Sequence, residues 1–510
     1  MLTSVDFSGR PFHFIGIGGI GMSALAYVIA KRKLPVSGSD IRSSHITERL
    51  QAIGAHIFAE QQASNLEFFS SSPNSAYLGA TSVKFPEAAN NSAAYLSVAL
   101  PESVLPQVVC STAINPANTE YRAALDLGCP ILHRSDLLAA LIQDYYSIAV
   151  AGTHGKTTTS SMIGYLLLEA GLDPTIIVGG EVTAWEGNAR LGEGKYLVAE
   201  ADESDGSLVK LPSEIGIITN IELDHPDHYE NLTEVIDTFQ RFASRCQTTI
   251  GCIDCTTVKE HLKPAISYSL KPEIGADYTA DCIVYRAEGT TARVWERGVI
   301  LGQLNLQLLG EHNLSNALAV VAVGRYLGLE FEVIAGAVAT FSGASRRFEK
   351  RGEANGIRFI DDYAHHPSEI NATLGAARIQ ANGLLKFPQT RVVAVFQPHR
   401  YSRTQTFLTE FGQCFSSADL VVVTDIYSAG EPKPSDISGE IVAQEIGLHH
   451  PQVVYQPSLK AVYSFLTENL QPGDLAIFLG AGNLNQIIPE VVAFYEQTAQ
   501  GMSQEYRLRA

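Results

Sequence analysis

The chain has 510 residues, of which 45% are hydrophobic and 18% are charged. This composition is too apolar for a disordered chain, and the length predicts two to four domains. The 54 acidic residues outnumber the 36 basic ones and give a net charge of −18, which disfavours nucleic acid as a partner because its phosphates would be repelled.

The seven cysteines are an odd number in a long chain and predict no disulfide framework. This pattern fits a reducing compartment, so we expect the protein to be cytoplasmic. The first ten residues lack the basic start and apolar run of a secretion signal. Residues 12–30 carry no formal charge, but closely spaced glycines interrupt them, so we expect no membrane insertion.

In chain order, residues 12–34 predict an apolar strand, a glycine turn and a helix. Residues 36–40 and 107–114 predict further strands of the same domain. Residues 61–106 are rich in Ser, Ala and Asn, carry little charge and have no clear periodicity. We interpret them as a loop-rich insertion in an N-terminal domain that covers residues 1–142.

A second strand–loop–helix unit occupies residues 146–171. The continuous apolar runs at 195–202 and 214–221 are typical of buried parallel strands. Four more apolar strands follow residue 342, with helix-like segments between several of them. We therefore predict an α/β protein of three domains: a Rossmann-like domain (1–142), a central P-loop ATPase-like domain (143–341) and a second Rossmann-like domain (342–510).

A phosphate-binding loop is predicted where the strand at 146–151 ends and a helix opens. Glycines let backbone N–H groups turn toward an anion, and the helix N-terminus adds positive potential. Lys156 would neutralise phosphate charge, and the Thr157 hydroxyl would ligate Mg²⁺. Val150 stands where the usual motif has another glycine, so this is a shortened P-loop. The predicted loop residues are Gly152, Thr153, His154, Gly155, Lys156, Thr157 and Thr158.

The first glycine loop, Gly16-x-Gly18-x-x-Gly21, matches the dinucleotide fingerprint, and Asp40 follows at a suitable distance. Taken alone, it would indicate an NAD-dependent oxidoreductase. Any diphosphate can bind such a helix end, however, and the chain already carries an ATP-type loop. We therefore expect a different nucleotide diphosphate at this loop.

With both loops in one chain, the sequence resembles the Mur ligases, the ATP-dependent amide ligases of peptidoglycan precursor synthesis. The resemblance covers nearly the whole chain, although the 61–106 segment is longer than expected. Within the family, the chain is most similar to members that join L-alanine to UDP-N-acetylmuramate. The matching motifs are IGIGGIGMS, STAI, AGTHGKTTT, EADESD, TNIELDH, GEHNLSNALA, RRFE, DDYAHHPSEI, QPHRYSRT, YSAGE and AIFLGAGN.

The resemblance implies that the N-terminal domain holds the UDP-sugar, the central domain ATP, and the C-terminal domain the amino acid. A substrate carboxylate attacks the γ-phosphate to give an acyl phosphate, and the amine of L-alanine then displaces phosphate. The implied cofactors are ATP and Mg²⁺, and the implied partners are UDP-N-acetylmuramate and L-alanine. The oligomeric state is left open as monomer or homodimer.

The resemblance also implies metal ligands, namely Glu200 and His225 together with Thr157. Hard oxygen ligands suit Mg²⁺. Asp202, Glu203 and Asp205 lie nearby in the sequence, and the pattern does not tell which of them touch metal. Many family members carry a carbamylated lysine beyond the His225 motif. No lysine lies between His225 and Lys259 here, so we expect none.

Further roles follow from the motifs. Asn316, rather than Asn313, is implied at adenine, although helix capping would explain either residue. Arg346 or Arg347 is implied at ATP phosphate and Asp361 at ribose, with a linker salt bridge as the alternative. The implied ATP-binding residues outside the loop are Asn316, Arg347 and Asp361. The residues implied to bind the UDP-sugar are Gly16, Gly18, Gly19, Gly21, Ser111 and Thr112. The residues implied in amino-acid binding and catalysis are Lys156, His366, Arg400, Arg403 and Tyr427.

Two further patterns are assigned no function. His365 and His366 are adjacent, but no Cys or His lies at a usual zinc-ligand spacing from them. Cys252-x-x-Cys255 lacks a second pair and is interpreted as incidental. Three alternatives to the ligase stay open: a recycling ligase that adds a tripeptide to the same UDP-sugar, an NAD-dependent oxidoreductase, and a nucleotide-dependent regulator without catalysis.

Overall fold

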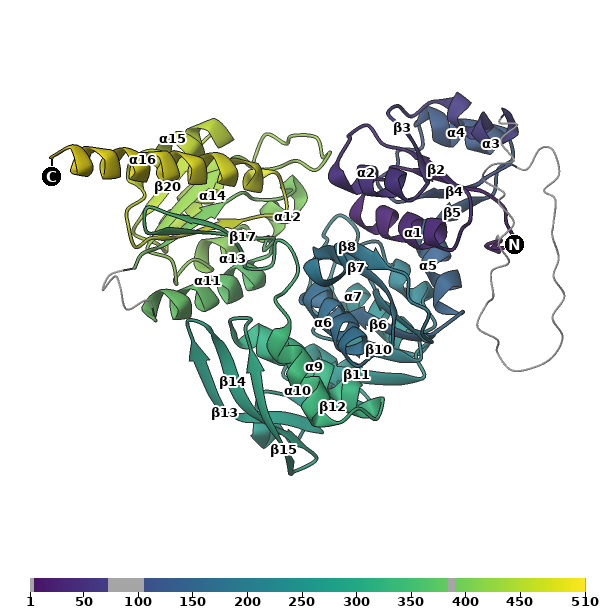
Figure 1. The fold of residues 1–510 in the computed structure, drawn as a ribbon, viewed down its shortest axis with the longest axis horizontal. Helices are drawn as coiled ribbons and strands as arrows, with labels where there is room; N and C mark the ends of the chain where they lie inside the picture. Colours follow the sequence, from purple (N-terminus) through teal and green to yellow (C-terminus); the bar gives the residue numbers. More distant parts are fainter. Residues whose placement is uncertain (1–3, 72–104, 384–389, 510) are drawn as a thin grey trace. The chain divides into compact units, whose positions relative to one another are not determined.

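The computed structural model describes residues 4–71, 105–383 and 390–509 (Figure 1). Its contacts divide the chain into two compact units. The first contains residues 1–151, 163–217 and 238–249, and the second contains residues 152–162, 218–237 and 250–510. Each unit is described by itself below.

The first unit opens with a five-stranded parallel sheet in the order β3-β2-β1-β4-β5. From the neighbouring parallel strands β1 and β4 the chain continues in opposite directions, to β2 on one side and to β5 on the other. Their carboxyl ends therefore form a topological switch point, where α/β folds bind ligands. The strands are β1 (Phe12–Ile15), β2 (Val36–Ser39), β3 (His56–Phe58), β4 (Gln107–Cys110) and β5 (Ile131–His133). The longer helices are α1 (Ile20–Lys31), α2 (His45–Ala52), α4 (Thr119–Asp126) and α5 (Arg134–Ile142).

The predicted insertion at 61–106 is described only at its two ends. Its start forms the short helical turns η1 (Ala63–Glu67) and α3 (Phe68–Ser71). Residues 72–104 of this prediction lie outside the described residues.

The rest of the first unit carries strands in the order β10-β6-β9-β7-β8. Central β6 and β9 pair in parallel and are almost wholly buried, as their continuous apolar sequences predict. The strands are β6 (Tyr146–Ala151), β7 (Thr175–Val182), β8 (Gly187–Arg190), β9 (Tyr196–Glu200) and β10 (Ile215–Ile218). Helices α6 (Lys156–Glu169) and α7 (Leu232–Ala243) are divided between the two units.

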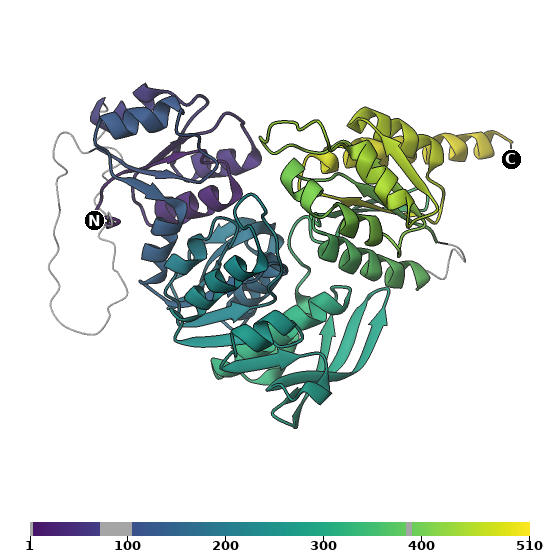
Figure 2. The same ribbon diagram turned by 180° about the vertical axis from the view of Figure 1, so that it is seen from behind.

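The second unit contains strands in the order β15-β14-β13-β12-β11, of which β13, β14 and β15 are antiparallel. Helix α10 packs on β15 (Figure 2). Helix α9 is buried along most of its length. The strands are β11 (Thr248–Cys252), β12 (Ile266–Ser269), β13 (Tyr278–Arg286), β14 (Gly289–Glu296) and β15 (Val299–Leu306). The helices are α8 (Thr256–His261), α9 (Glu311–Tyr326) and α10 (Phe331–Thr340).

The C-terminal part of this unit is a six-stranded sheet in the order β16-β17-β21-β18-β19-β20, parallel except for β16. The strands are β16 (Glu349–Ala354), β17 (Ile357–Asp362), β18 (Val392–Phe396), β19 (Leu420–Thr424), β20 (Val453–Gln456) and β21 (Leu475–Leu479). The helices are α11 (Pro367–Asn382), α12 (Tyr401–Thr406), α13 (Leu408–Gln413), α14 (Gly439–Gly447), α15 (Leu459–Asn469) and α16 (Ile488–Arg509).

Helices cover both faces of this C-terminal sheet, with α15 and α16 on one side and α11 and α13 on the other (Figure 1). Alternate residues of β18 accordingly enter two different cores. Ala394 and Phe396 pack with one helix layer, and Val393 and Val395 pack with the other. This double burial explains why β18 is apolar at every position.

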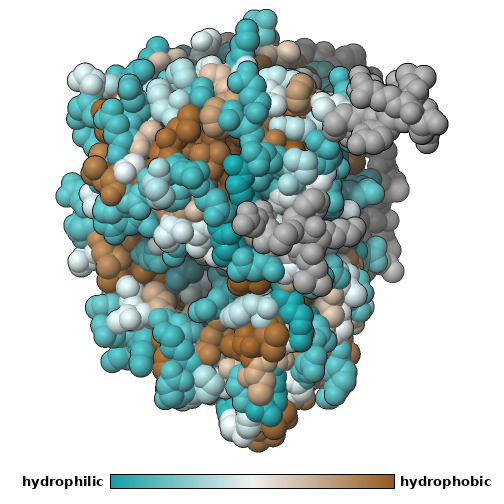
Figure 3. Space-filling view, turned by 90° about the vertical axis from the view of Figure 1, so that its left-hand side faces the viewer, coloured by the Kyte–Doolittle hydropathy of each residue, from teal (hydrophilic) through white to brown (hydrophobic). Residues whose placement is uncertain are grey.

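The predicted fold class is confirmed, since three mostly parallel α/β sheets carry the chain. The glycine-containing segment at 12–30 forms β1, a turn and α1, as predicted. Within the described residues, no helix is both long and apolar enough to cross a membrane. The face drawn in Figure 3 is mostly hydrophilic, with hydrophobic residues in small separate groups.

Candidate active site

The turn that precedes α6 has a backbone that only glycine fits at two positions. Gly152 has a φ of 142°, and a Cβ there would lie 1.9 Å from Thr219 Oγ1. Gly155 has a φ of 80°, and a Cβ there would lie 2.7 Å from Asn316 Oδ1. The glycines therefore permit a left-handed turn and a close approach of α9 to the loop.

Hydrogen bonds fix this loop to the segment that follows β10. Backbone N–H of His154 donates to Asn220 Oδ1 over 2.8 Å, and Thr219 Oγ1 donates to the His154 carbonyl over 2.6 Å. The Lys156 ammonium donates to the carbonyls of Gly152 and Thr153 over 2.7 and 3.1 Å. The loop thus holds its own lysine at the start of the helix, where a P-loop receives phosphate.

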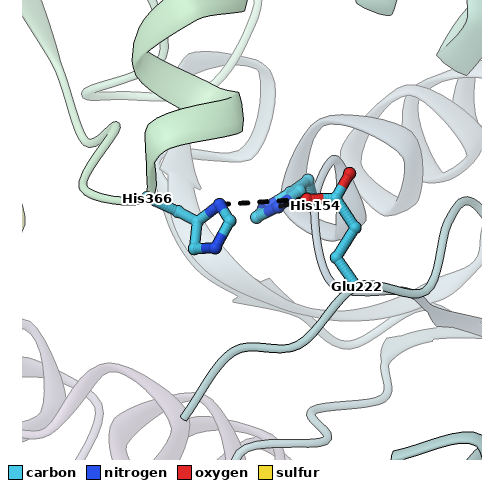
Figure 4. Close-up of side chains that lie close together, drawn as sticks. All are labelled: His154, Glu222 and His366. Carbon is cyan, nitrogen blue, oxygen red and sulfur yellow. Dashed lines mark hydrogen bonds and ion pairs between the residues drawn. The ribbon is translucent and has the colours of Figure 1, made fainter. Parts of the chain in front are cut away.

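A cluster of histidines and carboxylates lies beside the loop (Figure 4). His154 Nε2 is 3.3 Å from Glu222 Oε2, and His154 Nδ1 is 3.4 Å from Glu369 Oε1. His366 Nδ1 lies 3.9 Å from the same Glu222 oxygen. Ser368 adds a hydroxyl that donates to Glu222 Oε2 over 2.7 Å. The phosphate loop, the 218–227 segment and the start of α11 therefore meet at Glu222.

The two carboxylates set the protonation state of His154. Burial alone would lower the pKa of His154, but its hydrogen bonds to Glu222 and Glu369 outweigh burial and raise the pKa to about 10. Burial likewise opposes ionisation of Glu222, yet His154 lowers the pKa of that carboxyl to about 2. At neutral pH the cluster therefore holds an imidazolium between two carboxylates.

Two arginines of the C-terminal part bind carboxylates of the 218–227 segment. Arg403 Nε donates to Asp224 Oδ1 over 2.8 Å, and Arg403 Nη2 lies 3.4 Å from His225 Nδ1. Arg400 Nη1 donates to Asp227 Oδ2 over 2.8 Å. The predicted residues His225, Arg400 and Arg403 are thus brought together within the second unit.

Several of these residues have a left-handed backbone that disfavours side chains. His225 has a φ of 56°, Arg346 of 59°, Phe348 of 52°, Arg400 of 69° and Ala429 of 49°. Each such residue is strained, and residues of this kind concentrate at functional sites. All five lie in motifs that the sequence comparison with the family singled out or directly beside them.

The predicted nucleotide residues of the C-terminal part form ion pairs. Arg346 Nε lies 3.4 Å from Asp361 Oδ2, and burial raises the pKa of that carboxyl. Arg347 Nη1 lies 3.8 Å from Glu369 Oε1, which places it next to the histidine–carboxylate cluster. Both arginines therefore form ion pairs, Arg346 with Asp361 and Arg347 with Glu369.

The predicted amino-acid residues have defined local roles. The His366 side chain accepts from the N–H of Ser368 and caps α11. Tyr427 stacks on His399 with the rings 5.7 Å apart, and its carbonyl accepts from the N–H of Arg400. On α9, Asn316 Nδ2 donates to Asn313 Oδ1 over 3.4 Å.

Glu200 and its acidic neighbours belong to the first unit. Glu200 ends β9, and its Oε2 accepts from the N–H of Gly179 over 2.8 Å. Arg134 Nη2 donates to Asp202 and Asp205 over 2.8 and 3.2 Å. Asp202 and Asp205 are therefore ion-pair partners of Arg134.

The first glycine loop follows β1 at the switch point of the N-terminal sheet. The N–H groups of Gly16 and Ile17 donate to the Ser39 carbonyl, and that of Gly18 donates to Asp40 Oδ2 over 2.9 Å. Gly19 is the N-cap of α1, with Gly21 in its first turn. Ser111 and Thr112 follow β4, the neighbour of β1, and so lie at the same edge of the sheet.

Sequence reasoning missed Glu222, Glu369 and Asp224 as parts of the site. Each stands inside a quoted motif, so the signal available was an acidic side chain in an otherwise recognised segment. The seven cysteines are free, which agrees with the prediction of no disulfide framework. The Cys252 thiol forms a hydrogen bond with the Ser315 hydroxyl, and the Cys255 sulfur accepts a hydrogen bond from the backbone N–H of Ile221.

A phosphate loop on a parallel sheet, beside ionised histidine, carboxylate and arginine groups, defines a phosphate-binding enzyme of the three-domain α/β class. Three family models match the chain: the Mur ligase family catalytic domain at residues 11–146, the Mur ligase middle domain at 150–324 and the Mur ligase glutamate ligase domain at 346–482. The chain belongs to the Mur ligase family.

Curated relatives match over almost their whole length. The UDP-N-acetylmuramate–L-alanine ligase of Nostoc punctiforme is 67% identical over 503 residues, covering 99% of this chain and 100% of that protein. The enzyme of the same name from Microcystis aeruginosa is 63% identical, covering 97% and 98%.

Solved structures share the fold. The UDP-N-acetylmuramate–alanine ligase of Thermotoga maritima has a TM-score of 0.76 at 25% identity, covering 96% of this chain and 100% of that one. A murein peptide ligase from Psychrobacter arcticus has a TM-score of 0.65 at 21% identity, covering 96% and 99%. At 21% identity, the likeness to the murein peptide ligase concerns the fold alone.

Proposed function

We propose that this protein is an ATP-dependent ligase that joins L-alanine to the lactyl carboxylate of UDP-N-acetylmuramate in peptidoglycan precursor synthesis. The observation that carries the proposal is the phosphate loop, with its lysine held by Gly152 and Thr153, in a chain 67% identical to relatives of that name. The reaction converts ATP, UDP-N-acetylmuramate and L-alanine into ADP, phosphate and the alanyl product.

The first step forms an acyl phosphate, in which the lactyl carboxylate attacks the γ-phosphate and ADP leaves. Both reactants are anionic, so cations must screen them. Lys156 supplies one positive charge at the loop, and Arg347 supplies another from the C-terminal part. The left-handed turn at Gly152 and Gly155 presents backbone N–H groups to the phosphates.

The proposed magnesium ligands are Thr157, Glu200 and His225. Hydroxyl and carboxylate oxygens are the donors that Mg²⁺ prefers, so Thr157 and Glu200 fit the ion, whereas His225 would supply a nitrogen. Mg²⁺ would neutralise phosphate charge when bound. Within the second unit, Arg403 Nη2 lies 3.4 Å from His225 Nδ1, and Asp224 Oδ2 lies 3.6 Å from His225 Nε2.

The second step is attack of the L-alanine amine on the acyl phosphate, which releases phosphate through a tetrahedral intermediate. We assign His366, Arg400, Arg403 and Tyr427 to this end of the site. Arg403 is anchored by Asp224, so it acts by fixing the 218–227 segment. Arg400 is only partly buried, and its guanidinium is the better candidate for the amino-acid carboxylate.

The first glycine loop, with Ser111 and Thr112, is proposed to bind the UDP diphosphate. Asn316 and Asp361 are proposed to contact adenine and ribose. We expect the protein to act in the cytoplasm on small molecules, as a monomer or a homodimer.

One assay tests the proposal against its rivals. The protein is incubated with ATP, Mg²⁺, UDP-N-acetylmuramate and either L-alanine, glycine, L-serine or a tripeptide, and phosphate release and product mass are measured. We expect phosphate and an alanyl product with L-alanine. A tripeptide product would identify the recycling ligase. Absence of amide product, with NAD binding instead, would support the oxidoreductase.

A further inference from the structure

The geometry points to a second cation site: we propose that His154, Glu222 and His366 bind a divalent transition-metal ion of the Zn²⁺ class, at a place separate from the magnesium ligands. The three side chains come from the phosphate loop, the 218–227 segment and the start of α11. They are the candidate ligands drawn in Figure 4.

The spacing of the donor atoms is close to that of a metal site. One ligand atom from each residue lies within 4.8 Å of the others, and Glu222 Oε2 is 3.3 Å from His154 Nε2. A tetrahedral Zn²⁺ with bonds of about 2.0–2.2 Å holds its ligand atoms about 3.3–3.6 Å apart. Closing the cluster around an ion therefore needs side-chain movements of about 1 Å.

Glu369 orients His154 as a metal-site carboxylate does. It lies 3.4 Å from His154 Nδ1, on the side of the ring opposite Glu222. Imidazoles that bind metal usually donate their other N–H to a carboxylate, which fixes the ring and leaves the second nitrogen for the ion. In His154, Nδ1 faces Glu369 and Nε2 faces Glu222, so a metal ion would bind at Nε2 by displacing the proton held there.

His366 can complete the cluster at small cost. Its Nδ1 accepts a long hydrogen bond of 3.3 Å from Ser368 while it faces the Glu222 carboxylate at 3.9 Å. Two acceptors that face each other repel, and a cation between them removes the repulsion. Its buried Nε2 has no hydrogen-bond partner among the residues that the structure describes, so no second bond resists a small reorientation.

The donor set selects the kind of ion. Two imidazole nitrogens and one carboxylate oxygen suit Zn²⁺ and its neighbours, whereas Mg²⁺ prefers oxygen donors. Three protein ligands leave a fourth position for water. Such an ion would join the phosphate loop to α11, so it should inhibit turnover; this consequence rests on the proposed ligase function, whereas metal binding itself does not.

Metal binding is tested on the full-length protein without any substrate. Co²⁺ is titrated in the presence of millimolar Mg²⁺ while its visible absorption is recorded, and Zn²⁺ binding is measured by equilibrium dialysis. We expect one ion per chain with the intense bands of four-coordinate Co²⁺, not displaced by Mg²⁺. No saturable binding under Mg²⁺ would overturn the proposal.

Variants locate the ion. His366→Asn removes the imidazole but keeps a good N-cap for α11, and Glu222→Gln keeps the size of the side chain. Each should weaken Zn²⁺ and Co²⁺ binding at least about tenfold. The exposed His449→Ala and the magnesium-ligand variant His225→Ala should leave binding unchanged. Loss of binding in His225→Ala, or wild-type binding in His366→Asn, would place the ion elsewhere and refute the site. The Co²⁺ and Zn²⁺ binding measurements use no substrate, so their results remain valid even if the protein shows no ligase activity.

Discussion

Arg403 Nε donates a 2.8 Å hydrogen bond to Asp224 Oδ1, and both side chains are almost completely buried, at 1% and 5% exposure of the residues. This pair joins α12 to the segment that carries His225. A buried charge left without its partner is expensive, whereas the intact pair contributes little net stability. The pair therefore sets the position of the segment more than it stabilises the fold.

Removing one member of this pair should be strongly destabilising. Arg403→Met or Asp224→Asn should each lower the free energy of unfolding by about 3 kcal/mol, because the remaining polar group loses its partner. The variant that carries both substitutions should lose clearly less free energy of unfolding than the sum of the losses in the two single variants. Urea denaturation of the three variants measures this coupling. Additive losses would show that the two side chains do not act as a pair.

Lys156→Ala should abolish turnover and leave the fold intact. The ammonium donates to the Gly152 and Thr153 carbonyls of its own loop, and its removal takes away charge compensation at the phosphates. Phosphate release should fall by about 100-fold or more. The thermal unfolding midpoint serves as the control for folding. Activity within about tenfold of wild type would contradict the assignment of the phosphate loop.

Gly19→Ala should raise the KM for UDP-N-acetylmuramate and barely change the KM for ATP. A Cβ at this exposed position meets nothing closer than 3.5 Å within the protein, so the methyl group obstructs only a ligand. Gly18→Val should have the same direction, but a Cβ there lies 2.8 Å from Asp40 Oδ2 and also disturbs the loop itself.

The matched control for this experiment is Gly336→Ala, because a Cβ at Gly336 in α10 meets nothing within 4 Å. Steady-state kinetics with each substrate varied in turn gives the two KM values. Equal losses for both substrates in Gly19→Ala would mean that the two nucleotide loops are not separate sites.

The charged His154 should make stability depend on pH. The pKa of His154 is raised from 6.5 in an unstructured chain to about 10 in the folded protein. The stabilisation from this group is therefore complete below pH 6.5 and is lost as the pH rises toward 10. His154→Gln should be less stable than wild type at pH 7, and the difference should shrink by pH 10. A difference that stays constant would show that His154 is neutral in the folded protein.

The sequence predicted the parts of the fold that depend on local pattern. Glycine turns after apolar strands placed β1, β6 and the helices that follow them. The antiparallel strands β13, β14 and β15 were missed, although β13 alternates between buried and exposed residues along part of its length. This alternation of buried and exposed residues indicates an antiparallel strand, but it was not recognised among the parallel units of the chain.

The site was predictable only where one motif contains the chemistry. The sequence singled out His154, Lys156 and His225 because they stand in recognisable segments. The cluster of His154, Glu222 and His366 could not be predicted in this way, because its three members lie far apart in the chain and no ligand stands at a short spacing from His366. Only the packing of α11 beside the phosphate loop brings them together.

The backbone at His225 offers a practical route to a trapped complex. Its φ of 56° costs a side-chain-bearing residue on the order of 1 kcal/mol, which alanine would still incur and glycine would not. His225→Gly therefore removes the imidazole while relaxing the chain around it. The result should be a slow protein that is more robust than the usual alanine knockout, and so better suited to crystallisation with every reactant present.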